Sequence, residues 1–173
     1  MKKTYVVQLI IDIMMIIFGV CLFIYPGVRS INSNQVFYTT MGIYAFLELC
    51  EFVFDRTRGE PLYIFFTAGA AAFAGYFLRQ FPICYVLAGT IAVWTLAITI
   101  IKINSLEEIN LKKKYLFLIK LTSMSIFAML GILVSINLYY RVSTLVYMLA
   151  LLYMCYGAFE LGTDFVTYLS KNN

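Results

Sequence analysis

Residues 19–48 read GVCLFIYPGVRSINSNQVFYTTMGIYAFLE, in which two apolar runs flank a Pro-Gly step at Pro26 and a short polar segment. Proline lacks a backbone N–H donor and glycine adopts positive φ freely, so Pro26 and Gly27 end the first run. The polar segment is short enough to join two antiparallel neighbours. This stretch therefore predicts a helical hairpin.

The same pattern recurs along the chain. An interval of 56 residues relates Gly19 and Pro26 to Gly75 and Pro82. Self-similarity at a fixed interval indicates repeated structural units, and we predict three hairpins at about residues 5–55, 61–103 and 115–168. At twice that interval, 112 residues, Gly131, Arg141, Tyr156, Glu160 and Leu161 follow Gly19, Arg29, Tyr44, Glu48 and Leu49.

The composition is that of an integral membrane protein. Apolar residues make up 62% of the 173 residues and charged residues 13%, and the mean hydropathy is +0.87. Soluble domains are about half apolar and about one quarter charged. Six spans of about 20 residues fit this length with short connections. The predicted fold class is all-α, a polytopic membrane protein whose six transmembrane helices form one domain, residues 1–173.

Several function classes are disfavoured by composition. The net charge is +4, but the 13 basic residues are spread over the connections, so no basic face for nucleic acid is expected. The chain has no histidine and no Cys-x-x-Cys motif, so we predict no metal site, no cofactor and no enzyme activity. The four isolated cysteines are interpreted as packing residues: Cys21, Cys50, Cys84 and Cys155.

The basic residues also indicate an orientation. Cytoplasmic connections carry an excess of lysine and arginine, so both termini are expected in the cytoplasm. The first apolar run lacks a small-residue cleavage site and is expected to stay in the mature protein. Lys2, Lys3, Arg56, Arg58, Lys102, Lys112, Lys113, Lys114, Lys120 and Lys171 fall on one side, and Arg29, Arg79 and Arg141 on the other.

Small residues mark the expected helix contacts. In a bilayer, where water does not drive helices together, small side chains let backbones approach closely. One face of the expected helix at residues 62–80 is made of such residues, which predicts a helix that is either central in the bundle or part of a dimer interface. The predicted packing residues are Gly19, Ala68, Ala71, Gly75 and Gly131.

Acidic residues inside the expected spans are the candidate functional groups, because charge in a bilayer is costly. Asp12 and Glu48 lie ~10 Å below the cytoplasmic boundary on neighbouring helices. Two carboxylates in one site of low dielectric do not both ionise readily, so one would hold a proton. Tyr44 and Tyr156 precede Glu48 and Glu160 by four residues, so each pair shares a helical face. We predict Asp12, Glu48 and Glu160 as protonatable residues; alternatively, each only accepts a hydroxyl hydrogen bond and fixes helix registry.

Three further charges lie at shallow depth. Lys120 and Asp164 share one level and are predicted to form a structural ion pair. Glu51 lies near enough to the boundary to extend to water, and no role is assigned to it.

The repeated pattern resembles the HdeD-like family of small six-helix bacterial membrane proteins. The resemblance covers nearly the whole chain and implies an inner-membrane protein of the acid-resistance type of stress response. It supplies no catalytic or transport residues. The motifs that carry it are Gly19-x6-Pro26-Gly27, Gly42-Ile43-x4-Glu48-Leu49, Gly75-x6-Pro82, and Gly131 with Gly157-Ala158-Phe159-Glu160-Leu161.

Two functions from different classes follow as expectations. One is a stress-response membrane protein that binds or moves protons, or a small solute, through the buried carboxylates. The other is a non-catalytic scaffold that binds a second copy or another membrane protein within the lipid bilayer. Neutral replacement of the carboxylates separates the two, because only a proton carrier needs groups that titrate.

Overall fold

The computed structural model describes residues 3–24, 33–78, 84–104, 114–139 and 145–172. Within these ranges the chain is all-helical apart from the connection at residues 55–59, and it contains no strand. The predicted turns at Pro26 and Pro82 lie outside the described residues. The six helices are α1 (Lys3–Ile24), α2 (Ser33–Phe54), α3 (Glu60–Leu78), α4 (Cys84–Asn104), α5 (Lys114–Tyr139) and α6 (Leu145–Asn172).

The helix bounds agree with the sequence pattern to within a few residues. Pro61 lies in the first turn of α3, where its missing N–H is not needed. Five of the six described helices, α1, α2, α4, α5 and α6, are long and apolar enough to cross a membrane. The exception, α3, begins with Glu60 and Pro61 and is rich in alanine and glycine.

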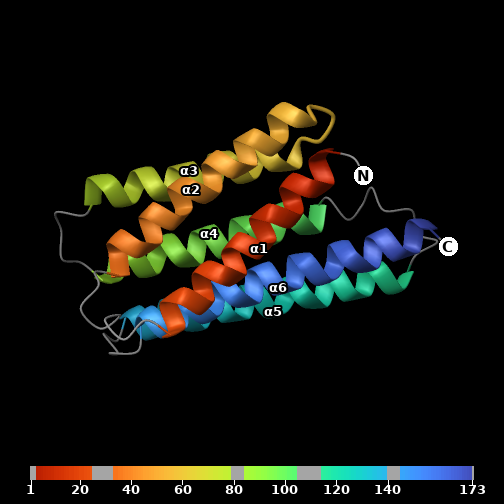
Figure 1. Cartoon of the computed structure of the whole chain (residues 1–173). Helices are drawn as coiled ribbons and strands as arrows, with labels where there is room; N and C mark the ends of the chain where they lie inside the picture. The colour runs from red at the N-terminus through yellow and green to blue at the C-terminus, as the bar shows by residue number, and fades with distance from the viewer. Residues whose placement is uncertain (1–2, 25–32, 79–83, 105–113, 140–144, 173) are drawn as a thin grey trace.

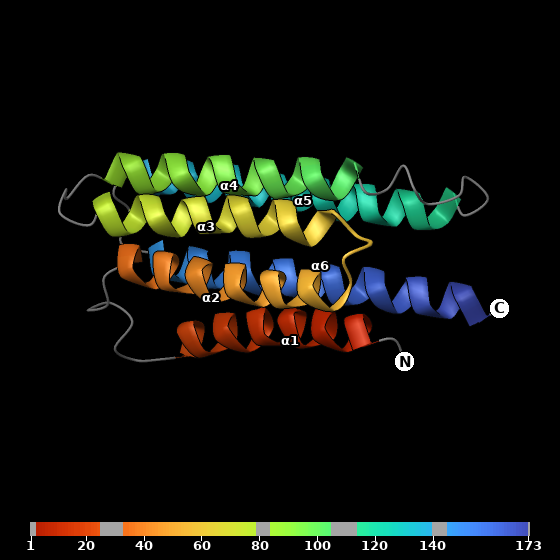
Figure 2. The ribbon, with the colours of Figure 1, turned by 90° about the horizontal axis from the view of Figure 1, so that it is seen from above.

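The helices run side by side and close into a ring (Figures 1 and 2). Each helix contacts the helices before and after it in the chain, and α6 contacts α1. The most extensive contacts join α1 to α6, α2 to α3 and α4 to α5. Contacts within the predicted hairpins are less extensive, and α1 touches α2 least. The second helix of each predicted hairpin therefore packs mainly against the first helix of another.

Glycines lie at all three of these extensive contacts. A Cβ atom at Gly19 of α1 would lie 2.7 Å from the carbonyl oxygen of Ala150 in α6. A Cβ at Gly75 of α3 would overlap the Tyr38 ring of α2, and one at Gly131 of α5 would overlap Thr95 of α4. Because real Cβ atoms do not approach neighbours this closely, glycine permits the observed backbone separations.

The helix α3 is one member of the ring and does not lie at its centre. The predicted packing residues Ala68 and Ala71 are buried. The other side of α3 exposes a row of aromatic side chains: Tyr63, Phe66, Phe73, Tyr76 and Phe77.

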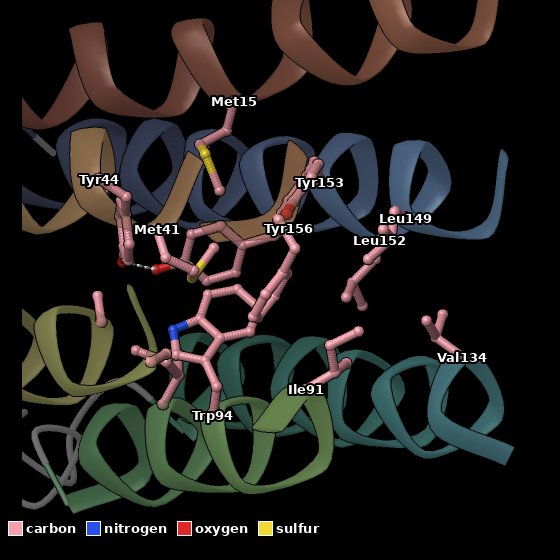
Figure 3. Packing of buried hydrophobic residues seen from close by; sticks show 14 of the residues in the cluster. Met15, Met41, Tyr44, Ile91, Trp94, Val134, Leu149, Leu152, Tyr153 and Tyr156 are labelled. Carbon is pink, nitrogen blue, oxygen red and sulfur yellow. Dashed lines mark hydrogen bonds between the residues drawn. The ribbon is translucent and has the colours of Figure 1, made fainter. Parts of the chain in front are cut away.

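A buried aromatic cluster fills the middle of the molecule (Figure 3). Trp94 of α4 is surrounded by the rings of Phe37, Tyr44, Phe127 and Tyr156, whose centroids lie 5.8–6.3 Å from that of Trp94. At these separations the tilted and edge-on rings attract one another as well as filling space. Large side chains thus occupy the space between α2, α4 and α6, whose backbones make few close approaches.

Side chains that are buried, or in the case of Lys102 largely buried, form one stripe along each of these three helices. The stripes follow a spacing of four, three and four residues, which keeps the side chains on one face of a helix. They comprise Phe37, Met41, Tyr44 and Glu48 on α2; Ile91, Thr95, Ile98 and Lys102 on α4; and Leu149, Tyr153, Tyr156 and Glu160 on α6.

Candidate functional site: a buried centre of carboxylates around one lysine

Each of the three stripes ends in a charged residue: Glu48 on α2, Lys102 on α4 and Glu160 on α6. The C-terminal ends of α2 and α4 lie at the end of the bundle where both chain termini are found (Figure 1). The apolar core is therefore closed at this end by a layer of charge.

Lys102 lies at the centre of this layer. Its Nζ lies 2.9 Å from Oε1 of Glu60 and 3.1 Å from Oε2 of Glu160. The exposed fractions of the three side chains are 12% for Lys102, 26% for Glu60 and 5% for Glu160. Charge-assisted hydrogen bonds of this length are strong when water is largely excluded. One lysine thus connects α3, α4 and α6.

A small polar cavity lies beside Lys102. Its volume is about 10 Å³, which is room for about one water molecule. Besides Glu60 and Lys102, its charged lining residues are Asp12, Glu48, Glu51 and Arg58. We call Asp12, Glu48, Glu51, Glu60, Lys102 and Glu160 the carboxylate–lysine centre.

Asp12 reaches the cavity from α1. Its side chain is 3% exposed, and its Oδ2 has no hydrogen-bond partner among the described residues. Gly157 of α6 lies against the backbone at Asp12: a Cβ there would be 2.6 Å from the Asp12 carbonyl oxygen. The glycine therefore lets α6 approach α1 closely at this level.

The tyrosines one turn before the glutamates meet each other. The hydroxyl oxygens of Tyr44 and Tyr156 are 2.5 Å apart and share a hydrogen bond (Figure 3). Both residues are buried, and Tyr156 also lines the cavity. This bond joins α2 to α6 between the aromatic cluster and the carboxylate–lysine centre.

The predicted protonatable residues lie together, but in different environments. Asp12 and Glu48, predicted to face each other, line the same cavity. Glu160 binds Lys102 through Oε2, while its Oε1 is buried with no partner among the described residues.

Two predictions about the shallow charges are corrected. Glu51 does not extend to water: it is 4% exposed and lines the cavity together with Arg58 of the α2–α3 connection. In the described part of the chain no salt bridge links Lys120 to Asp164, and Oδ2 of Asp164 is buried without a hydrogen-bond partner. Equal depth did not give an ion pair, because depth does not fix how each helix is rotated about its axis.

Lys102 and Glu60 are the site residues that the sequence analysis missed. In the sequence, Lys102 serves only as an orientation signal, and Glu60 is not singled out. The spacing of Ile91, Thr95, Ile98 and Lys102 contains the missing signal, because it continues a buried face to the lysine. Lysine at such a position needs buried partners.

Glu60 lies at the N-terminus of α3, outside the apolar part of that helix. Burial by itself would raise the pKa of its carboxyl group, but the charge and hydrogen bond of Lys102 outweigh this and lower the pKa from 4.5. Glu60 is thus held ionised as a partner of Lys102.

No group of three cysteine or acidic side chains in the described part of the chain is arranged to hold a metal ion. The chain matches no protein-family model, no curated protein and no solved structure in comparisons with each. The HdeD-like resemblance therefore stays a prediction.

Proposed function

We propose that this chain is a bacterial inner-membrane protein that binds or moves protons at the carboxylate–lysine centre, as part of an acid-stress response. The proposal places six spans in the bilayer as three repeated hairpins, with both termini in the cytoplasm. Five sufficiently apolar helices and the distribution of basic residues support the placement. The equivalent glycines at the three extensive contacts support the repeats.

The main support for the proposal is that acidic side chains outnumber basic ones in the interior of the protein around Lys102. Five carboxylates from four helices gather around one largely buried lysine. An ionised carboxylate removed from water is very unfavourable unless it is paired, and protonation is a direct way to neutralise it. Lys102 pairs with Glu60 and Glu160, which leaves Asp12, Glu48 and Glu51 as the groups best placed to take up protons.

The test compares Glu48→Gln with Glu160→Gln. Both replacements keep the shape of the side chain and remove its titration, but only Glu160 is bonded to Lys102. We expect Glu48→Gln to melt in detergent near the wild-type temperature, yet to abolish survival of acid stress and pH-driven flux in proteoliposomes. We expect Glu160→Gln to lose thermal stability as well. Wild-type acid survival and flux from a folded Glu48→Gln protein would rule the proton proposal out.

A scaffold is the second candidate, because Lys102 bridges three helices as a structural ion pair would. A scaffold needs the bridge but no titrating group. It predicts that variants of the centre lose function only in proportion to the folded protein they lose. Binding to a second copy or another membrane protein would then survive Glu48→Gln unchanged.

A further inference from the structure

We propose that the hydroxyl groups of Tyr44 and Tyr156 relay protons between Glu48 and Glu160. The inference rests on the proposed function, because it concerns protons at the same centre. It goes beyond that function by assigning the path between two of the carboxylates, and by giving a role to two residues that stay neutral throughout.

The position of the two tyrosines is the first argument. Their hydroxyl oxygens lie 2.5 Å apart in a hydrogen bond that crosses from α2 to α6, and both side chains are buried (Figure 3). Each tyrosine lies four residues before a glutamate on the same helical face. Long side chains on a helix lean towards its N-terminus, so Glu48 and Glu160 both extend back towards the hydroxyl pair. The Glu48 carboxyl group lies within hydrogen-bonding reach of the Tyr44 hydroxyl.

The limits of the cavity are the second argument. Glu48 lines the cavity, whereas Glu160 is not part of its lining among the described residues. Oε1 of Glu160 is a buried acceptor without a partner in the described part of the chain. Lys102 joins the cavity to Glu160, but an ammonium group has no lone pair to accept a proton. A proton on Glu48 therefore needs another group to reach Glu160, and the tyrosine pair lies between the two helices that carry them.

The hydrogen-bonding capacity of the pair is the third argument. A hydroxyl group both donates and accepts, so it passes a proton on without remaining charged. Only one of the two hydroxyl hydrogens lies in the shared bond, and the other needs an acceptor. The rings of Trp94 and Phe127 pack against the tyrosines and carry no acceptor. The second hydrogen is therefore directed to the side of the carboxylates.

The transfer begins with Glu48 protonated and Glu160 ionised. The carboxyl O–H bond of Glu48 breaks as its proton binds the Tyr44 oxygen. Tyr44 gives its own hydrogen to the Tyr156 oxygen, and Tyr156 gives its hydrogen to Oε1 of Glu160. One proton has then moved from Glu48 to Glu160, both tyrosines are neutral, and rotation of their hydroxyl groups resets the relay.

Other charged groups face the relay from every side. Lys102 is bonded to Glu160 and favours its ionised form, so the proton rests on Glu48 and reaches Glu160 only transiently. Its arrival there would weaken the bond to Lys102. The surrounding charged groups are Asp12 on α1, Glu51 on α2, Arg58 in the connection, Glu60 on α3, Lys102 on α4 and Asp164 on α6.

The experiment compares Tyr44→Phe, Tyr156→Phe and the double variant. Phenylalanine keeps the ring in the aromatic cluster and removes only the hydroxyl group. Each single variant leaves one buried hydroxyl unpaired, whereas the double variant removes both and should melt close to wild type in detergent. We expect all three to lose pH-driven proton flux in proteoliposomes by about 100-fold. A purely structural pair predicts instead that flux recovers in the double variant together with stability.

Tyr153→Phe is the matched control. Tyr153 lies one turn before Tyr156 on α6, is buried, and has a hydroxyl group without a partner among the described residues. We expect this variant to keep the wild-type flux. Wild-type flux in a folded double variant, or in either folded single variant, overturns the inference.

A second measurement does not depend on flux. The infrared difference spectrum of the full chain in detergent is recorded as the pH is lowered. We expect a carboxylic-acid band that Glu48→Gln removes, together with tyrosine bands that Tyr44→Phe and Tyr156→Phe alter and Tyr153→Phe leaves unchanged. A carboxylic-acid band without these tyrosine bands overturns the relay.

The two measurements also separate the relay from the proposed function. Flux that Glu48→Gln abolishes and the tyrosine variants leave intact would keep the function and reject the relay. If the wild-type protein shows no flux, movement of protons across the bilayer is rejected. The infrared bands alone then decide whether the tyrosines exchange a proton between the two glutamates.

Discussion

Lys102 shows how one side chain is kept buried and charged at the end of an apolar core. It lies on the same helical face as Ile91, Thr95 and Ile98, so its position on α4 directs it inwards. Glu60 and Glu160 reach it from two other helices. Because Lys102 is the ionic partner of both glutamates, replacing it would leave two carboxylates on different helices without their counter-charge.

Lys102→Met should therefore destabilise the protein by about 3–5 kcal/mol, because Glu60 and Glu160 would lose their shared counter-charge. Lys120→Met is the control: Lys120 is only partly buried and forms no salt bridge within the described chain. Thermal or denaturant unfolding in detergent measures both. The double variant with Glu160→Gln should recover part of the loss, and equal melting of the two lysine variants would contradict the bridging role.

Glu60→Gln tests the same bridge through its pH dependence. The lowered pKa means that the ionised carboxylate stabilises the folded state above pH 4.5, and that this contribution is lost as the pH falls through the folded-state value. We expect the variant to lose about 1–3 kcal/mol near neutral pH. The gap from wild type should close as the pH is lowered below 4.5. Unfolding curves at several pH values measure it; a gap that persists in acid would assign the loss to packing.

Sequence predicted part of this centre. A charged residue inside an apolar run is by itself a sign of function. Asp12, Glu48 and Glu160 could therefore be singled out from their positions within the expected spans. Lys102 could not, because a lysine near a helix end serves equally as an orientation signal. To tell an orientation signal from a buried partner of the carboxylates, one must know how each helix is rotated about its axis. That rotation is fixed only by the packing of the helices.

At the scale of the helix, three glycines at equal intervals lie where helices from different predicted hairpins meet. Gly75 of α3 lies against Tyr38 of α2, and Gly69, on the same helix, has nothing within 4 Å of an added Cβ. The two positions separate the effect of close packing from that of helix propensity.

Gly75→Ala should destabilise the protein by about 1–3 kcal/mol, since the new methyl group would overlap the Tyr38 ring. Gly69→Ala should be neutral or stabilising by up to about 1 kcal/mol, because alanine is the better helix former. Melting in detergent and the oligomer profile on size exclusion provide the measurements. If both variants behaved alike, Gly75 would not be a packing contact.

The helices themselves were predictable, because long apolar runs, Pro-Gly steps and polar connections are local signals. Which helices pack against one another was not predictable. Residues within a hairpin are close in sequence, which favours the expectation that they pair most closely. The opposite is seen, since α1 packs far more extensively on α6 than on α2. Apolar residues cover most of each helix, so periodicity does not say which face meets which neighbour.

For the whole molecule, the aromatic cluster and the carboxylate–lysine centre divide the interior into an apolar part and a charged end. Figure 1 shows both termini at one end, together with the α2–α3 connection. Under the proposed function, the side of the membrane at which this end lies would decide whether protons reach the centre from the cytoplasm or from outside. Orientation is thus part of the proposed function.

The positive-inside rule predicts that both termini, and with them the centre, lie on the cytoplasmic side. The prediction is tested with single cysteines at Asn173 and at Ser33, which are expected on opposite sides of the membrane. The four native cysteines are first replaced by alanine. An impermeant thiol reagent added to intact cells should label the cysteine at Ser33 and leave the one at Asn173 unmodified until the cells are broken. Labelling in the reverse order would place the carboxylates near the outer surface. Protons would then enter the centre from the acidified medium, and acid survival would no longer require movement of protons through the apolar part of the bundle.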